Sequence, residues 1–142
     1  MMKKLIAFFC SYFILSAVLV YAQKASFENW QRINDKAQQA YKLGDYITAI
    51  ELFEKSRVEA KKEFGIRHPN YAASLHNLAL SYQWVDAYQK AEPLYLEALK
   101  IRREVLGENH LDYATTLSEL ATLYADMGDF EKCPACKTWV IP

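Results

Sequence analysis

The apolar positions of this chain recur at helical spacing over most of its length. In the middle of the sequence Leu75, Leu78, Ala79 and Tyr82 stand at i, i+3, i+4 and i+7, which is the apolar stripe of an amphipathic helix. Similar stripes occur before and after it, and glycines separate several of them. The pattern predicts an all-α chain, with helices at about residues 26–43, 45–64, 69–84, 87–106 and 111–127.

The stripes belong to an internal repeat of 42 residues. His68 and His110 are 42 residues apart, and so are Leu78 and Leu120. The same interval relates aromatic and small positions along the whole array: Tyr46, Tyr88 and Phe130; Ala49 and Ala91; Phe53 and Tyr95; Ala79 and Ala121; Tyr82 and Tyr124. Each repeat contains two predicted helices, so the unit is a helix pair. A stack of such pairs is the expected architecture.

The placement of these residues resembles the tetratricopeptide repeat, whose pattern is W-x2-L-G-x2-Y…A-x3-F. The middle repeat matches it with Leu75, Leu78, Ala79, Tyr82, Ala91 and Tyr95, and the earlier repeat supplies Ile33, Lys36, Ala37, Ala40, Ala49 and Phe53. The 42-residue unit resembles the repeats of kinesin light chains and of bacterial arrays that precede CHAT or histidine-kinase domains. Over residues 27–132 the resemblance implies a right-handed α-solenoid of about two and a half repeats.

Residues 1–22 have the pattern of a signal peptide. Lys3 and Lys4 are followed by an uncharged apolar run to Ala22, and Val20 and Ala22 occupy the small-residue positions of a cleavage site. We expect cleavage before Gln23 and export to a periplasmic or extracellular location, with no membrane contact afterwards. An uncleaved N-terminal membrane anchor is the alternative, because residues 5–22 reach the lower length limit of a membrane span.

The charge composition excludes one class of partner. The chain has 17 basic and 17 acidic residues and a formal net charge of +0. No basic stripe of the kind that nucleic acid requires is present. The expected partner is a protein or a peptide.

The histidines do not indicate catalysis or metal binding. His68 and His110 stand at the same helix start in two repeats, so capping and packing explain them, whereas His76 has Ser118 as its counterpart and is expected at the surface. No catalytic residue, metal ligand or cofactor site is predicted.

Cys133 and Cys136 form a C-x-x-C pair, which can be a redox dithiol, half of a zinc site or a local disulfide. Cys133 stands where Ala49 and Ala91 stand in the earlier repeats. The third repeat then fails, so the domain is expected to end at residue 132, followed by an irregular tail over 133–142. This end predicts a truncated array without a cap, which would self-associate.

The resemblance implies that a ligand lies on the concave face, which the first helices of the repeats line. One stripe on the predicted first helices faces that side. Its members are Asn34, Gln38, Tyr41 and Lys42 in the first repeat, His76, Leu80, Gln83 and Trp84 in the second, and Ser118, Thr122, Ala125 and Asp126 in the third. Asn77 is a further candidate binding residue on the same predicted helix as His76. The stripe is polar and nearly neutral, which suits an extended peptide held by amide and hydroxyl contacts. A solvated face without a ligand is the alternative.

A carboxylate clamp of the kind that some tetratricopeptide domains use is not expected, because only Asn77 matches and Glu119 would repel a carboxylate. The leading hypothesis is an exported, non-catalytic interaction scaffold. Two alternatives remain open: the N-terminal sensor part of a signalling or CHAT protease-like protein, and a small thiol–disulfide protein that uses the C-x-x-C pair.

Overall fold

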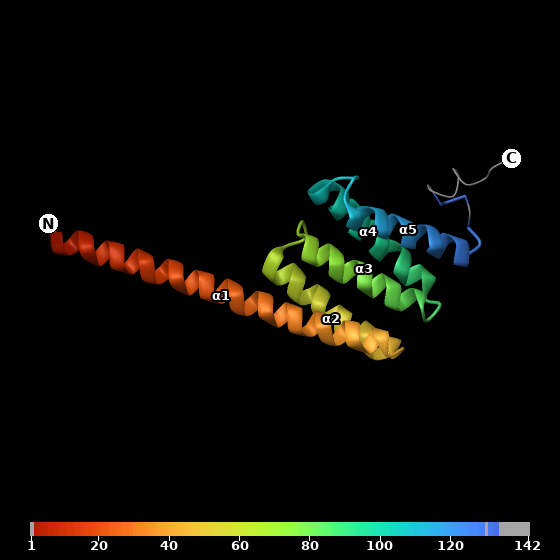
Figure 1. Ribbon diagram of the computed structural model, residues 1–142, viewed down its shortest axis with the longest axis horizontal. Helices are drawn as coiled ribbons and strands as arrows, with labels where there is room; N and C mark the ends of the chain where they lie inside the picture. Colours follow the sequence, from red (N-terminus) through yellow and green to blue (C-terminus); the bar gives the residue numbers. More distant parts are fainter. Residues whose placement is uncertain (1, 130, 134–142) are drawn as a thin grey trace.

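The computed structural model describes the backbone of residues 2–129 and 131–133, and side chains from Leu15 onward except those of residues 17, 23 and 26. These residues form five helices: α1 (Met2–Lys42), α2 (Tyr46–Phe64), α3 (Pro69–Gln83), α4 (Tyr88–Leu106) and α5 (Leu111–Asp126). Each helix packs mainly against the next one along the chain (Figure 1). The prediction of an all-α stack of antiparallel helix pairs is confirmed.

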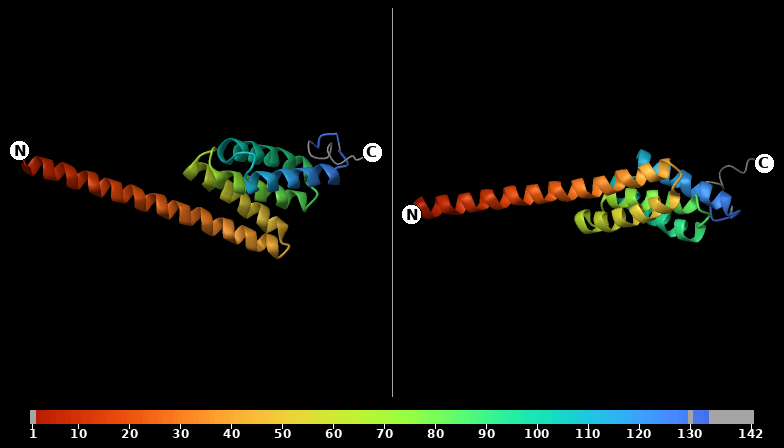
Figure 2. Two further views of the ribbon diagram at one scale, coloured as in Figure 1. Left: turned by 45° about the horizontal axis from the view of Figure 1, so that its top comes forward. Right: turned by 90° about the horizontal axis from the view of Figure 1, so that it is seen from below.

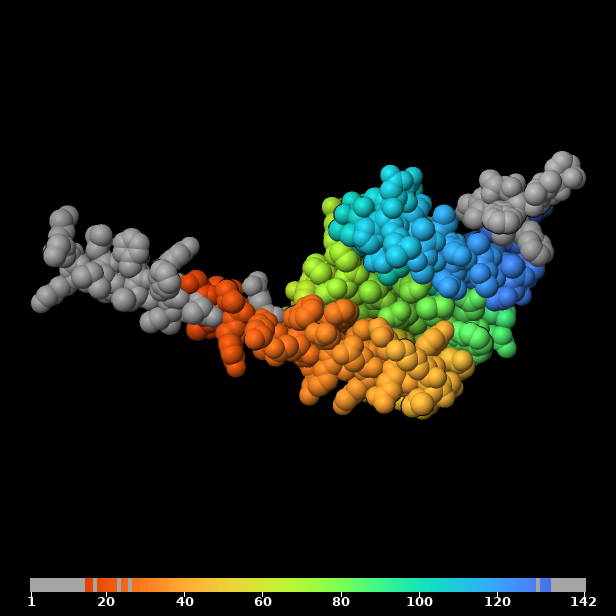
Figure 3. Space-filling view, viewed as in Figure 1, coloured from red at the N-terminus to blue at the C-terminus, as the bar shows by residue number. Residues whose placement is uncertain are grey.

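The helices form two layers. In the right-hand view of Figure 2, α1 and α5 run along one side of the stack, and α2 and α4 run along the other. The first helices of the repeats are adjacent, since α3 contacts both α1 and α5. Figure 3 shows the face on which α1, α3 and α5 lie in that order. This surface is called the first-helix face below.

Side-chain capping marks where α3 and α5 begin. The Nδ1 atoms of His68 and His110 accept hydrogen bonds from the backbone N–H groups of Asn70 and Asp112, each at 3.1 Å. An imidazole thus satisfies one of the free N–H groups at the start of α3 and of α5. The capping role predicted for both histidines is confirmed.

The first helix is longer than the sequence pattern predicted. It starts at Met2 rather than near residue 26, because neither glycine nor proline occurs before Gly44 to interrupt it. Figure 1 shows its N-terminal half running away from the stack. Within the described residues, no helix combines the length and the apolar character needed to cross a membrane.

Small residues at equivalent positions lie where the two helices of the first repeat, and those of the second, meet. Ala49, Ala91 and Cys133 are completely buried, as are Ala37 and Ala79 on the first helices. Between the first and second repeats the core also holds a hydroxyl network. Its members are Trp30, Ser56 and Ser74, which come from α1, α2 and α3.

The turn after the first helix has the same left-handed conformation in each repeat. Gly44 and Gly128 have φ values of 78° and 71° at the equivalent positions of the first and third repeats. In the second repeat this position is Asp86, with φ of 58°. Asp is one of the few L-residues that tolerate this region.

Candidate functional site

A cavity of about 410 Å³ opens on the first-helix face between the second and third repeats. We call it the α3–α5 groove. It is lined by eight residues of α3, the following turn, α4 and α5: Leu80, Gln83, Trp84, Asp86, Tyr88, Glu119, Thr122 and Asp126. Four of the predicted partner-binding residues, Leu80, Gln83, Trp84 and Thr122, therefore meet in one cavity.

Trp84 forms an aromatic wall at the edge of this groove. Its ring stacks on that of Tyr46, with centroids 5.4 Å apart and an interplanar angle of 6°. Its indole N–H donates a hydrogen bond to the hydroxyl of Tyr41, another residue of the predicted stripe. These contacts hold the indole in place while 58% of the residue stays exposed. A fixed, exposed indole is a ready surface for an apolar or cationic group.

The amide of Gln83 is held at both ends. Its Nε2 donates to Asp126 Oδ2 at 2.7 Å, and its Oε1 accepts a hydrogen bond from the Tyr95 hydroxyl at 3.0 Å. These two bonds, one to α5 and one to α4, fix the orientation of the Gln83 amide, which lines the groove. Sequence spacing had placed Gln83 on this face but gave no sign of the bond to Tyr95.

The α3–α5 groove is acidic, whereas the predicted stripe along all first helices is nearly neutral. Asp86, Glu119 and Asp126 line it, and none of its eight lining residues is Lys or Arg. Desolvation raises the pKa of the Glu119 carboxyl. Burial, and then the charge of Glu119, raise the pKa of the Tyr95 hydroxyl. The predicted stripe did not include the negative charges of Asp86 and Glu119, because Asp86 lies in a turn and Glu119 lies on the neighbouring stripe of α5.

His76 does not lie at the surface, contrary to the sequence prediction. It is 7% exposed, and its ring meets that of Tyr95 edge-on with centroids 5.6 Å apart. Desolvation, and then the charge of Arg102, lower its pKa to about 4. Arg102, whose charge acts on His76, binds the hydroxyl of Thr116 and the backbone carbonyl of Asp112, both in α5. His76 is thus unavailable to a partner on the open face.

The remaining predicted partner-binding residues lie outside the groove. Asn34, the counterpart of His76, is also buried, at 7% exposure, which contradicts its predicted place on an open face. Gln38 and Ser118 are exposed and Asn77 is half-buried, but none of the three lines the α3–α5 groove.

Cys133 is completely buried and disulfide-bonded, and packs in the cluster that contains Ala91 and Leu120. Cys136, the partner that the C-x-x-C spacing predicts, lies outside the described residues, as does the rest of the tail. A buried sulfur is shielded from attack by an external thiolate, so Cys133 acts as a packing residue in this structure. Among the described residues, no group of three His, Cys, Asp or Glu side chains could hold a metal ion.

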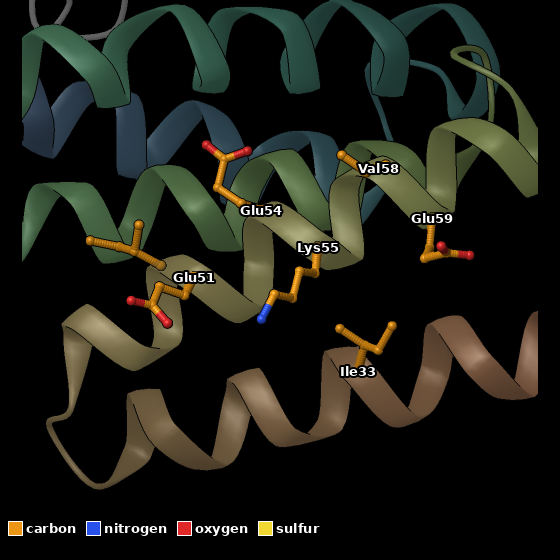
Figure 4. Close-up of a pocket in the computed structure, with 7 residues that line it drawn as sticks. Ile33, Glu51, Glu54, Lys55, Val58 and Glu59 are labelled. Carbon is orange, nitrogen blue, oxygen red and sulfur yellow. The ribbon is translucent and has the colours of Figure 1, made fainter.

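A second cavity, of about 650 Å³, lies between α1 and α2 and was not predicted. Figure 4 shows Ile33 of α1 facing the side chains of α2 across it. Its apolar part is formed by Ile33, Ile50 and Val58, and its polar part by Glu51, Glu54, Lys55 and Glu59. We call it the first-repeat cavity.

Repeat register explains why the first-repeat cavity is open. Leu75, the counterpart of Ile33, is fully buried and packs in one cluster with Ala60 of α2. Ile33 is only half-buried, since no described second helix covers it on that side. The sequence pattern treats equivalent positions of the repeats alike, so it could not predict that Ile33 is less buried than Leu75.

Comparison with known families and structures agrees with this architecture. The family described as the tetratricopeptide repeat matches residues 29–83 and 73–132. Comparison with curated proteins gives no match.

Solved structures share the fold. BtubC (BKLC) from P. vanneervenii is 20% identical with a TM-score of 0.71, over 75% of this chain and 42% of that chain. A putative kinesin light chain of Podosopora anserina with nearly identical TPR-like repeats is 25% identical with a TM-score of 0.68, over 76% of this chain and 51% of that chain. This chain thus spans about half the length of the solved structures that it matches.

Proposed function

This chain belongs to the tetratricopeptide-repeat family, whose repeats generally serve as non-catalytic scaffolds for protein–protein interaction, and on that premise we propose an exported scaffold that binds an extended segment of a partner protein. The bound segment lies along the first-helix face and enters the α3–α5 groove. The chain itself performs no catalysis.

The observation that carries this proposal is the exposed indole of Trp84 at the edge of a formed cavity. A ring that is stacked on Tyr46 and bonded to Tyr41 loses little conformational entropy when a ligand packs on it. The cavity volume of about 410 Å³ falls within the range of ligand sites. Groups from α3, α4 and α5 converge on it, so the groove depends on the repeats being stacked.

Export is supported by the sequence of residues 1–22 together with the packing of α1. All described side chains from Leu15 to Phe27 are exposed, and Trp30 is the first buried residue among the described side chains of α1. Cleavage after Ala22 would therefore leave the core of the first repeat intact. The proposed location is periplasmic or extracellular, with retention by an uncleaved N-terminal segment as the alternative.

The binding proposal is tested by selecting peptides that bind the protein from a library of unstructured peptides. The protein is purified in the form that cells produce. Peptides that bind the parent are measured again on Trp84→Ala and on Val58→Ala. Trp84→Ala should weaken binding about tenfold or more, since exposed aromatic anchors dominate such contacts. Val58→Ala is the matched control, because Val58 is as exposed as Trp84 but lines the first-repeat cavity.

Two results would contradict the proposal. Loss of binding in Val58→Ala alone would move the site to the first-repeat cavity. Absence of any peptide binder, with the parent folded by circular dichroism, would remove the proposed peptide-binding function.

A further inference from the structure

We infer that the segment held in the α3–α5 groove carries an arginine, with its guanidinium between Glu119 and Asp126 and its aliphatic stem against Trp84. The inference rests on the proposed function of the groove and names the chemistry of its partner.

The charge of the groove favours a cationic ligand. Asp86, Glu119 and Asp126 give the groove three carboxylates, and no cationic side chain is among its lining residues. A concave site lined by one sign of charge concentrates ligands of the opposite sign. An acidic segment would be repelled here, and a neutral one would leave the carboxylates without a counter-charge.

The carboxylates of the groove have oxygens that can accept hydrogen bonds from a ligand. Asp126 accepts a hydrogen bond from Gln83 at 2.7 Å through Oδ2, and Asp86 accepts one from the Tyr88 hydroxyl at 2.7 Å through Oδ1. Each therefore keeps an oxygen for a further donor. Glu119 is half-buried, and no described side chain donates to it or forms an ion pair with it. A cationic donor from the partner would compensate the desolvation of Glu119.

The groove also has an aromatic and apolar wall, which favours arginine over lysine. Trp84 and Leu80 lie beside the carboxylates in the same cavity. A guanidinium is planar, stacks on an indole face and can donate to two oxygens at once, whereas an ammonium is a compact, strongly hydrated charge. Its three-carbon stem covers apolar surface while the head reaches the carboxylates. The combination of ring, apolar side chain and acids fits arginine better than lysine.

The test uses the tightest peptide from the library and a copy in which each arginine is replaced by citrulline, which keeps the shape and loses the charge. Fluorescence anisotropy gives the dissociation constant of both peptides on the parent, on Glu119→Gln and on Glu104→Gln. Glu104 is the control because it is exposed on α4 and outside the groove.

On the parent, citrulline should weaken binding about tenfold, as expected for loss of a charge-assisted hydrogen bond. The arginine peptide should bind Glu119→Gln about tenfold more weakly than it binds the parent. On this variant the difference in affinity between the arginine and citrulline peptides should be smaller. Glu104→Gln should behave like the parent. Thermal melts establish that each variant is folded, and Trp84→Ala supplies a second variant in the same groove.

The outcomes separate this inference from the proposed function. Selected peptides without arginine, or equal binding of the arginine and citrulline peptides, would overturn the inference, while dependence on Trp84 would leave the proposed function standing. Equal effects of Glu119→Gln and Glu104→Gln would overturn it too, because only the overall charge would then matter. If no peptide binds, both fail.

Discussion

The indole N–H of Trp30 donates a hydrogen bond to the hydroxyl of Ser74 at 3.0 Å, joining helix α1 to helix α3 in the core. Ser74 Oγ also lies 3.0 Å from Ser56 Oγ of α2. One small hydroxyl therefore ties three helices of two repeats together. This contact has no counterpart at the next repeat boundary, where Thr116 and Arg102 take its place.

Ser74→Ala should destabilise the protein by about 1–3 kcal/mol, because it leaves the buried indole N–H of Trp30 without an acceptor. Urea denaturation measures the free energy of unfolding. Ser81→Ala is the matched control: Ser81 is equally buried, but its hydroxyl donates only to the Asn77 carbonyl of its own helix. A loss of the same size in both variants would mean that the hydroxyl network adds nothing.

Lowering the pH should destabilise the protein through His76. Because its pKa is about 4 in the folded state and 6.5 for an ordinary exposed histidine, the unfolded chain takes up a proton that the folded chain excludes. Stability from this residue is present above the unfolded pKa and is lost as the pH falls toward the folded one. Between pH 7 and pH 5 the loss should be about 2 kcal/mol.

The control for this prediction is His76→Asn, which introduces the residue that the first repeat has at the same position, Asn34. Denaturation of both proteins at the two pH values isolates the histidine. If the parent and His76→Asn lose equal stability between pH 7 and pH 5, the imidazole is not the group responsible.

Ala79→Leu should destabilise the protein by about 1–3 kcal/mol, since Ala79 is fully buried and extra methylenes must displace its neighbours. Ala121→Leu should cost less, because Ala121 is only half-buried. Thermal melts compare both with Ala125→Leu, an exposed position on α5 that should change little. An Ala79→Leu protein that melts like the parent would contradict the close helix contact.

Gly44→Ala should destabilise the first repeat by about 1 kcal/mol, because an L-residue pays for the left-handed conformation. No atom lies within 4 Å of a Cβ built at Gly44, so the cost is conformational rather than steric. Asp86→Gly, the reverse change at the equivalent turn, should not destabilise the protein despite the lost bond to Tyr88. If Gly44→Ala and Asp86→Gly both lower the free energy of unfolding, the two turns do not share the geometry described here.

The exported protein should begin at Gln23. Intact mass and N-terminal sequencing of the periplasmic or secreted fraction measure this directly. Cleavage there removes the Val20–Ala22 site and no buried residue among those described. Recovery of the chain with Met1 in the membrane fraction would show an uncleaved anchor instead.

The sequence by itself determined the helix pairs and their register. The 42-residue interval between His68 and His110 located two helix starts, and small residues such as Ala79 and Ala91 marked the helix contacts. Periodicity succeeds here because each repeat makes the same local choices and packs mainly on its neighbours. It also brought Leu80, Gln83, Trp84 and Thr122 to one face.

Only the tertiary structure decided which positions of that face are open. His76 and Asn34 share the stripe with exposed residues, yet neighbouring helices bury both. Glu119 belongs to a neighbouring stripe of α5, and Asp86 belongs to the turn after α3. The stacking of α3 against α5 brings both residues into one groove with Trp84. The burial of a residue and the charge around it depend on helices that are distant in sequence, so they cannot be predicted from the pattern of one helix.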